Sequence, residues 1–389
     1  MIFLKSLIAM LAVGPIMTVN GQSAADPHPA DHLRAAKAGL GARLFSDASL
    51  SADGKVSCAS CHLPDHGFSD RRAVSIGVNS RTGTRNAPDL ATVGSYRFFS
   101  WDGRASTLEA QVLMALLDPF EHGFESASQL LEKLDLDKTY PGDFSTVFGS
   151  ESRSVTIENF LSAITSYIRS LESSQDWLDR YIVDSSNEKV PEITTRGLEV
   201  FRNIAGCSDC HTITDLHAPL TDNGFHEGVA RPHDPSMHLA DVATQLASTS
   251  ADARDRLISG DPAISDLGRF VVTLNPDDIG KFRTPSLRNV ASTGPYMHDG
   301  SIESLEEAID WELYRRGAAS GRAIVLTPQD RSALIAFLKS LTNRNHEPIV
   351  NPEPREFSHM VPSTLRSQPA SREHQRDAWS RSGITSRSL

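Results

Sequence analysis

The chain has 389 residues, which corresponds to about two or three domains, and 39% of them are hydrophobic, enough to form buried cores. Its net charge of -11 gives no electrostatic reason to expect nucleic acid as a partner. The four cysteines occur as two closely spaced pairs, so none is left for a separate disulfide framework.

The N-terminus has the pattern of a secretory signal peptide, which we predict to cover residues 1–21. Lys5 precedes an apolar run that Gly14 and Pro15 interrupt, and small residues follow up to Gly21. An uncleaved membrane anchor is the alternative, although the run is short for a span. No later stretch reaches the ~18 apolar residues that a transmembrane helix requires. We therefore expect an exported, periplasmic protein with no membrane span in its mature form.

Apolar residues that recur at three- and four-residue steps predict a series of helices. The last of them has a clear start signal, in which Thr327 can cap the helix and Pro328 occupies its first position. No convincing run of alternating residues predicts a strand, so the predicted fold class is all-α with long cofactor-wrapping loops. The predicted helices cover residues 31–45, 106–117, 156–171, 194–202, 304–316 and 327–341.

A short cysteine and histidine motif occurs twice, as Cys-Ala-Ser-Cys-His at residues 58–62 and Cys-Ser-Asp-Cys-His at residues 207–211. A C-x-x-C-H sequence is typical of c-type haem attachment, in which both thiols bond to the haem and the histidine binds its iron. One copy alone could also begin a zinc or redox site, but an all-cysteine zinc site would consume both copies. We therefore predict two covalently bound haem c groups. The predicted attachment residues are Cys58, Cys61, Cys207 and Cys210, and the predicted iron ligands are His62 and His211.

The segments around the two motifs predict the domain organisation. Residues 62–88 are irregular and rich in Gly, Asp, Asn and Arg, a length that is unusual unless the loop is functional or covers a cofactor. Residues 196–201 resemble residues 38–45 ahead of the first motif, which suggests a duplicated haem domain. The composition of the C-terminal region predicts a disordered tail. After the signal peptide, we predict an N-terminal haem domain at 22–185, a C-terminal haem domain at 186–344 and the tail at 345–389.

Five further motifs keep their order and spacing along the chain. They are Arg-Asn-Ala-Pro at 85–88, Trp-Asp-Gly-Arg at 101–104, Asp-Pro-Phe-Glu at 118–121, Arg-Thr-Pro-Ser-Leu-Arg-Asn-Val at 283–290 and Pro-Tyr-Met-His-Asp-Gly at 295–300. Together with the haem motifs, they resemble the bacterial di-haem cytochrome c peroxidase family, which includes the MauG-type enzymes. The resemblance covers about residues 40–341. It implies two cytochrome-c-like α-helical domains whose haems face each other across the interface.

The resemblance also assigns roles at the N-terminal haem, where the family reacts with hydrogen peroxide. Glu121 matches the acid–base carboxylate, which would move a proton between the two peroxide oxygens. Gln111 matches the distal amide, and Trp101 matches the indole between the haems. Considered alone, Glu121 could be a solvated loop acid and Trp101 a core residue. Asp102 and Arg104 could simply form an ion pair or hold a haem propionate.

The family resemblance further implies a calcium ion. Asn86 matches the asparagine ligand, and the carbonyls of Thr293 and Pro295 match two backbone ligands. Calcium accepts amide and carbonyl oxygens together with water, which would have to complete this small set. The alternative is that Asn86 only caps a turn before Pro88.

Three positions depart from the family pattern. Val78 stands where many classical members have a histidine that binds the resting iron, so we expect an open or water-filled sixth site, with His66 as an alternative ligand. Classical members place a methionine, and MauG-type members a tyrosine, fourteen residues past the equivalent of His298; that position is Glu312, with Tyr314 two residues later. Leu305, Ile309 and Glu312 share one face of the predicted helix, which favours Glu312 pointing inward. We nevertheless favour Tyr314 as the sixth iron ligand, because phenolate is the better-known haem ligand and a two-residue bulge would bring Tyr314 to this position. His122 replaces the usual methionine, without an evident reason.

The sequence therefore predicts a periplasmic di-haem peroxidase in which electrons pass through the C-terminal haem. The electron donor is either a small redox protein or a partner protein whose own side chain is oxidised. The departures from the classical pattern favour the second donor. A non-catalytic di-haem electron-transfer cytochrome is the alternative from a different functional class.

Overall fold

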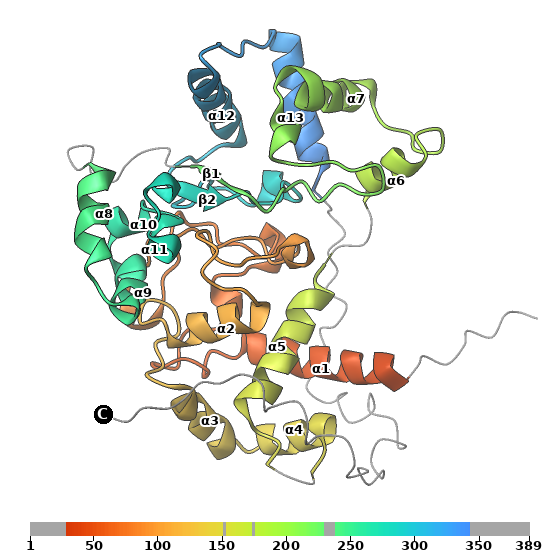
Figure 1. Cartoon of the computed structure of the whole chain (residues 1–389). Helices are drawn as coiled ribbons and strands as arrows, with labels where there is room; N and C mark the ends of the chain where they lie inside the picture. Colours follow the sequence, from red (N-terminus) through yellow and green to blue (C-terminus); the bar gives the residue numbers. More distant parts are fainter. Residues whose placement is uncertain (1–28, 151–152, 173–175, 229–237, 343–389) are drawn as a thin grey trace, which may run out of the picture.

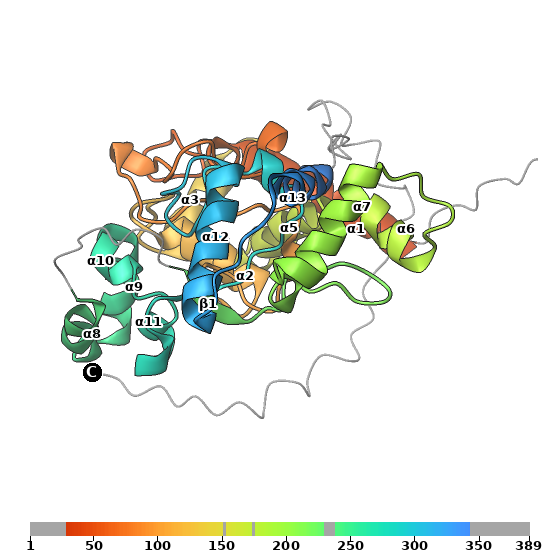
Figure 2. The same cartoon turned by 90° about the horizontal axis from the view of Figure 1, so that it is seen from above.

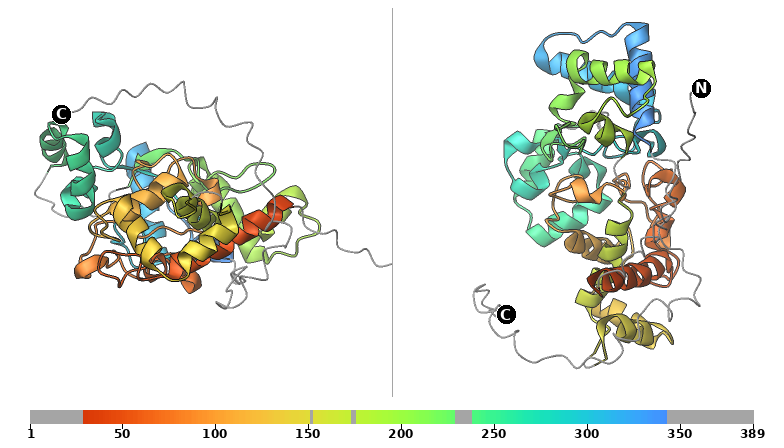
Figure 3. Two further views of the ribbon diagram at one scale, coloured as in Figure 1. Left: turned by 90° about the horizontal axis from the view of Figure 1, so that it is seen from below. Right: turned by 90° about the vertical axis from the view of Figure 1, so that its right-hand side faces the viewer.

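The computed structural model describes residues 29–150, 153–172, 176–228 and 238–342, so the predicted signal peptide and tail lie outside the described residues. These residues are mostly helical, as predicted. Figure 1 shows α1–α5 in the lower half of the molecule and α6, α7, α12 and α13 in the upper half. We call the first group the N-terminal lobe and the second the C-terminal lobe. Helices α8–α11 form a group at one side (Figures 2 and 3).

The N-terminal lobe has one hydrophobic core, formed by residues between Ala36 and Leu171. Three of its helices have an N-terminal cap, in which a side-chain hydroxyl accepts a hydrogen bond from a backbone N–H of the first turn. The capping residues are Thr107, Ser126 and Thr156. The first cysteine motif follows the first helix on a short 3-10 turn, η1 (Cys58–Ser60). The helices are α1 (Pro29–Ser46), α2 (Leu108–Leu117), α3 (Ala127–Leu136), α4 (Tyr140–Phe148) and α5 (Ile157–Ser170).

The C-terminal lobe has a separate core, which extends from Leu178 to Leu341. Leu178 belongs to α6, so the chain passes from one core to the other between Leu171 and Leu178, ahead of the boundary predicted at residue 185. The second cysteine motif follows α7 and a π-helical turn, η5 (Val200–Ile204), on the turn η6 (Cys207–Asp209). The helices of this lobe are α6 (Trp177–Val183), α7 (Glu192–Glu199), α12 (Leu305–Ser320) and α13 (Pro328–Ser340).

The chain between the second motif and α12 contains elements that the sequence did not predict. Strand β1 (Phe225–Glu227) pairs antiparallel with β2 (Lys281–Arg283), so that Phe225 lies opposite Arg283. With three residues each, these strands are too short to show an alternating pattern. The side group of helices has its own small core, and Thr84 donates a hydrogen bond to the Ile258 carbonyl at 2.7 Å, which joins the group to the N-terminal lobe. It comprises α8 (Leu239–Ala247), α9 (Ala251–Gly260), α10 (Pro262–Ser265) and α11 (Phe270–Thr273).

The two lobes share a helix crossing that explains the sequence similarity ahead of the two motifs. A Cβ atom on Gly41 of α1 would lie 2.1 Å from the carbonyl oxygen of Ala163 on α5. A Cβ atom on Gly197 of α7 would likewise lie 2.0 Å from the carbonyl oxygen of Ala333 on α13. Glycine is therefore required for α1 to cross α5 closely in the N-terminal lobe, and for α7 to cross α13 closely in the C-terminal lobe. A buried phenylalanine follows each glycine by four residues, at Phe45 and Phe201.

Candidate active site

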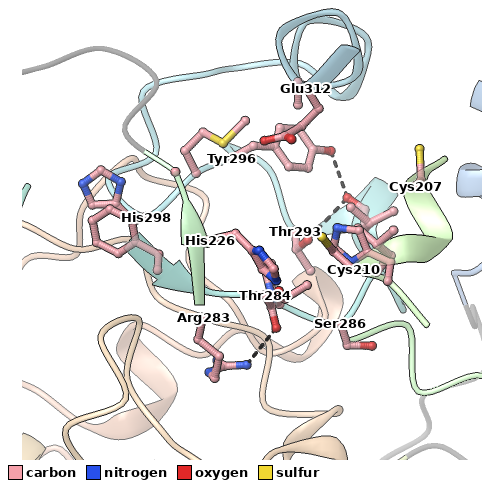
Figure 4. Close-up of a pocket in the computed structure, with 18 of the residues that line it drawn as sticks. Cys207, Cys210, His226, Arg283, Thr284, Ser286, Thr293, Tyr296, His298 and Glu312 are labelled. Atoms are coloured by element: carbon pink, nitrogen blue, oxygen red, sulfur yellow. Dashed lines mark hydrogen bonds between the residues drawn. The ribbon is translucent and has the colours of Figure 1, made fainter. Parts of the chain in front are cut away.

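A cavity in the N-terminal lobe has the first cysteine motif in its wall. Cys58, Cys61 and His62 line it together with Phe45 and residues of the irregular loop after the motif. The second cavity, in the C-terminal lobe, is lined in the same way by Phe201, Cys207, Cys210 and His211. Figure 4 shows Cys207 and Cys210 on one side of this second cavity, with Glu312 of α12 on another. Each predicted haem attachment set therefore lies at one cavity.

The two motif histidines are held in the same way. The Nδ1 of His62 lies 2.7 Å from the Phe68 carbonyl oxygen, and the Nδ1 of His211 lies 2.9 Å from the Leu220 carbonyl oxygen. A carbonyl can only accept, so Nδ1 carries the proton in both rings and Nε2 keeps its lone pair. Burial lowers the pKa of both imidazoles, which favours the neutral form that binds metals. This arrangement fixes the ring and leaves Nε2 available to an iron ion.

The four cysteines are free thiols. Burial raises the pKa of Cys58 to about 12, that of Cys61 to about 11 and that of Cys207 to about 12. Buried thiols of this kind are protonated at neutral pH and are poor metal ligands until they are deprotonated. In the first cavity, two such thiols and a neutral imidazole in one wall fit a covalently attached haem better than a thiolate metal site.

Both cavities share one wall, which includes Trp101. The Trp101 indole donates from Nε1 to the Asn86 carbonyl oxygen at 2.8 Å, and the Trp101 carbonyl accepts the Arg283 N–H at 2.8 Å. The Arg283 guanidinium lies over the Tyr96 ring, 3.6 Å from its centroid. These bonds hold the indole in a fixed orientation between the two cavities. The residues that line both cavities are Asn86, Ala87, Pro88, Asp89, Tyr96, Trp101 and Arg283.

Glu121 and Gln111 line the first cavity, together with the first motif. The Glu121 side chain is accessible because it faces the open cavity. Desolvation by the surrounding protein and the nearby charge of Asp118 raise its pKa to about 8, against the opposing effect of Arg104. The Gln111 amide oxygen accepts a hydrogen bond from the Ser100 hydroxyl. A carboxyl group that titrates near neutral pH can both accept and donate a proton.

The loop that carries Val78 holds the Glu121 segment through the backbone. The Val78 N–H donates to the Glu121 carbonyl at 2.9 Å, while the valine side chain is buried and is not among the cavity-lining residues. A Cβ atom on Gly77 would lie 1.9 Å from the Phe120 carbonyl oxygen, so glycine is required for this approach. His66 does not line either cavity.

His122, for which the sequence offered no explanation, bridges the loop before the first motif and the motif itself. Its Nδ1 lies 2.8 Å from the Leu50 carbonyl oxygen, and its Nε2 lies 3.7 Å from the Cys58 sulfur. The ring is buried, and burial lowers the pKa of the imidazole. No local pattern could have indicated this contact, because its partners are separated by more than sixty residues.

The three residues predicted to bind calcium all line the second cavity. Asn86 is buried, and its amide nitrogen donates to the carbonyls of Arg72 at 3.2 Å and Ala73 at 3.1 Å. These bonds orient the amide and leave its oxygen to act as an acceptor. Thr293 and Pro295 lie in the wall of the same cavity as Asn86.

The structure separates Glu312 from Tyr314, the residue that the sequence favoured as sixth iron ligand. Glu312 lines the second cavity and is half-buried, and its carboxylate is 2.7 Å from Arg315. Tyr314 is 68% exposed and is not among the lining residues. The reason is helical geometry, since two residues along an α-helix rotate a side chain by about 200° to the opposite face. The two-residue displacement that a Tyr314 ligand requires is absent from α12, which is continuous from Leu305 to Ser320.

Two charged residues, Arg85 in the wall of the first cavity and Asp118 beside Glu121, were not assigned a role from the sequence. Asp118 raises the Glu121 pKa, but its influence depends on the turn that brings the two carboxyl groups together. Arg85 lines the first cavity, and its Nε and Nη1 are buried without a hydrogen-bond partner among the described residues. Burial lowers the pKa of Arg85 to about 10. A buried guanidinium with free donors is suited to an anionic group such as a haem propionate.

None of the helices that the structure describes combines the length and the hydrophobicity that a membrane span requires.

Comparison with known proteins gives consistent matches along the chain. The sequence profile of a family described as di-haem cytochrome c peroxidase matches residues 35–187. Cytochrome-c peroxidase IdrP1 of Denitromonas iodatirespirans is 31% identical over 378 residues, covering 90% of this chain and 96% of that protein. Methylamine utilization protein MauG of Methylophilus methylotrophus is 31% identical over 312 residues, covering 78% and 82%. A solved structure of a MauG-like protein associated with microbial copper homeostasis has a TM-score of 0.64 at 29% identity, covering 86% of this chain and 93% of that one.

Proposed function

The chain belongs to the di-haem cytochrome c peroxidase family, whose members are oxidoreductases acting on peroxide, and we propose that it reduces hydrogen peroxide at the cavity of the N-terminal lobe. The observation that carries this proposal is the placement of Glu121, a carboxyl group of raised pKa, in the same cavity as the first cysteine motif. The reaction consumes two protons and two electrons for each peroxide, and it releases two water molecules.

The residues at both cavities fit a covalently attached haem. Cys58 and Cys61 would attach the first group, Cys207 and Cys210 the second, and Nε2 of His62 and of His211 would bind the two irons. Bound haem supplies the iron centre at which peroxide is reduced. Arg85 would pair its free guanidinium nitrogens with an acidic group of the cofactor. On this basis each lobe would form one haem domain, with the boundary between the two cores at residues 171–178 rather than at the residue 185 expected from the sequence.

In the first cavity, Glu121 transfers the proton. Its ionised carboxylate accepts a proton from one peroxide oxygen and returns that proton to the other oxygen, which leaves as water. Gln111, fixed by the Ser100 hydroxyl, orients the peroxide within reach of this carboxylate. Because Val78 offers no ligand atom, we expect this iron to be open at rest, so EPR of the ferric protein should show one high-spin and one low-spin haem. Two low-spin signals would contradict this expectation.

Electrons reach the first cavity from the second. Trp101 lies in the shared wall and would relay them one at a time. Glu312 would supply a carboxylate ligand to the iron of the second haem, because Glu312 lines the cavity and Tyr314 does not. An anionic ligand stabilises the oxidised iron relative to a methionine, which favours storage of oxidising equivalents. Asn86, Thr293 and Pro295 would bind a calcium ion next to this pathway.

We propose that the protein is exported to the periplasm and that its electrons come from a protein, either a small redox carrier or a partner whose own side chain is oxidised. The match to a cytochrome-c peroxidase supports a redox carrier as the donor, and the match to MauG supports a partner protein. Position 78 is a valine instead of the classical histidine, and position 312 is a glutamate instead of the classical methionine. These two differences favour a partner protein whose side chain is oxidised over a small redox carrier.

The variant Glu121→Gln tests the proposed function. Glutamine keeps the shape of the side chain but cannot transfer the proton, so the rate of reaction with hydrogen peroxide should fall by about 10²–10⁴-fold. The matched control is Glu125→Gln, four residues later on the protein surface, which should react at the wild-type rate. Both haem content and the ferric spectrum should stay unchanged in the two variants. Unaltered peroxide reactivity in Glu121→Gln would favour the non-catalytic electron-transfer cytochrome instead.

A further inference from the structure

Tyr314, which is not placed to bind the second haem, forms an aromatic pair with Trp311 on the outer side of α12. The two ring centroids lie 5.7 Å apart with an angle of 39° between the ring planes. We propose that Trp311 and Tyr314 form an electron relay between the surface of the C-terminal lobe and its cavity. An external protein donor would deliver electrons at the surface end, to Tyr314. This inference rests on the proposed function, because peroxide is the oxidant that draws the electrons inward.

The position of α12 supports this path. Ala308 and Glu312, on successive turns, line the second cavity, whereas Tyr314 is 68% exposed. Trp311 lies between these environments. It is half-buried, and it packs with Tyr296 around the small cluster of Ile302 and Ala308.

Tyr296 provides the inner end of the path. It lines the second cavity, as Figure 4 shows, and its hydroxyl donates to the Val290 carbonyl at 2.9 Å. Tyr296 and Trp311 pack against the same cluster of Ile302 and Ala308, and Trp311 pairs with the exposed Tyr314, so the proposed path passes from the cavity through this cluster to the surface. Electron transfer slows steeply with distance, so side chains that can be oxidised and re-reduced shorten each step.

The environments of the outer two rings suit one-electron transfer. The Trp311 indole Nε1 is buried and has no hydrogen-bond partner among the residues that the structure describes, so this indole can pass an electron without losing its proton to an acceptor. The exposed phenol of Tyr314 can release its proton to water as it is oxidised. An electron from the donor and a proton from water then restore the phenol. Two such transfers supply the two electrons for one peroxide.

The same lobe contains a second aromatic pair that serves as a control. The Trp177 and Tyr181 rings lie 6.0 Å apart, a spacing close to that of the proposed relay. Their connection toward the cavity runs through Phe337 and Phe201, whose rings are much harder to oxidise. The Trp177–Tyr181 pair therefore has a similar composition without a redox-active route inward.

The test uses the full-length protein with both haems and adds hydrogen peroxide without an electron donor. The electrons must then come from the protein itself, so the exposed Tyr314 should be oxidised and should form dityrosine-linked dimers. Mass spectrometry should identify peptides joined through Tyr314. Tyr314→Phe and Trp311→Phe should each lose these dimers, and Trp311→Tyr should restore them because it returns an oxidisable ring. Tyr181→Phe should form dimers as the wild type does.

The outcomes separate the relay from the proposed function. If the wild-type haem absorbance does not respond to peroxide, the proposed function fails and the relay fails with it. If the haems respond and peroxide is consumed, but Tyr314 is not oxidised or is still oxidised in Trp311→Phe, only the relay is refuted. Haem content and the ferric spectrum of each variant check that the fold is retained.

Discussion

Replacing Asp118 by asparagine should make the enzyme faster at neutral pH. Desolvation and, after it, the negative charge of Asp118 raise the Glu121 pKa, and an ionised Glu121 is needed to accept the peroxide proton. Asparagine keeps the side-chain oxygen that accepts the Phe120 N–H at 2.8 Å, so the turn that carries Glu121 should be preserved. The other Asp118 oxygen accepts the Ser259 hydroxyl, and the asparagine amide can donate to that hydroxyl oxygen instead, so the substitution removes a charge while keeping both contacts of the side chain.

The size of the effect follows from the raised pKa. With a pKa of about 8, about a tenth of the Glu121 carboxyl groups are ionised at pH 7. If the loss of the Asp118 charge lowers this pKa by roughly one unit, about half become ionised, and the rate with peroxide rises roughly fivefold. Well above pH 8 the group is ionised in both proteins, so their rates should converge.

The assay is the second-order rate constant for the reaction with hydrogen peroxide, measured as a function of pH between about 5.5 and 9.5 in steps of about half a pH unit. The wild-type rate should rise with pH toward a plateau, and Asp118→Asn should reach the same plateau at lower pH. Glu125→Gln, an exposed acid on the same loop, is the control and should follow the wild-type curve. A rate that falls through this range would refute Glu121 as the base, and a midpoint that Asp118→Asn does not lower would refute the electrostatic coupling between Asp118 and Glu121.

Three further perturbations test the remaining assignments. Gly41→Ala forces a Cβ atom against the α5 backbone and should destabilise the fold by about 1–3 kcal/mol in thermal unfolding. The control Gly142→Ala places its Cβ atom where nothing lies within 4 Å, so it should be neutral or stabilise the fold by about 0.4–1 kcal/mol. Equal melting temperatures would contradict the close helix crossing. Glu312→Gln should change the ferric EPR signal of the low-spin haem, and Tyr314→Phe should not; the reverse result would restore the tyrosine ligand. Trp101→Phe should retain the reaction with peroxide but slow electron transfer between the haems in stopped-flow absorbance, and an unchanged transfer rate would exclude the indole as the relay.

The cysteine motifs show why part of this site is readable from sequence. The thiols and the histidine of residues 58–62 and 207–211 are close in the chain, so local backbone geometry brings them to one cavity wall. The helices at 156–171 and 327–341 were predicted for a similar reason, because their apolar periodicity is local and their first turns carry capping residues. The short strands β1 and β2 were missed, since they depend on a partner more than fifty residues away.

The choice between Glu312 and Tyr314 illustrates what the sequence could not decide. Both residues lie on the same predicted helix, and chemical precedent favoured the tyrosine. The shared face of Leu305, Ile309 and Glu312 pointed to Glu312, but the sequence could not exclude a bulge in the helix. The continuous α12, with Glu312 at the cavity and Tyr314 at the surface, shows that no such bulge is present. His122 is a similar case, since its contacts with Leu50 and Cys58 join distant parts of the chain.

The sequence by itself determined the two cysteine motifs, the helical class and the family, because each of these depends on residue types at short or regular spacing. The tertiary structure alone decided which groups from distant segments share a cavity. It placed Trp101 in the wall between the two cavities and Asp118 beside Glu121, and it left Tyr314 at the surface against Trp311. The physical reason is that burial, electrostatic coupling and ring contacts arise from the packing of helices and loops, which no local pattern specifies.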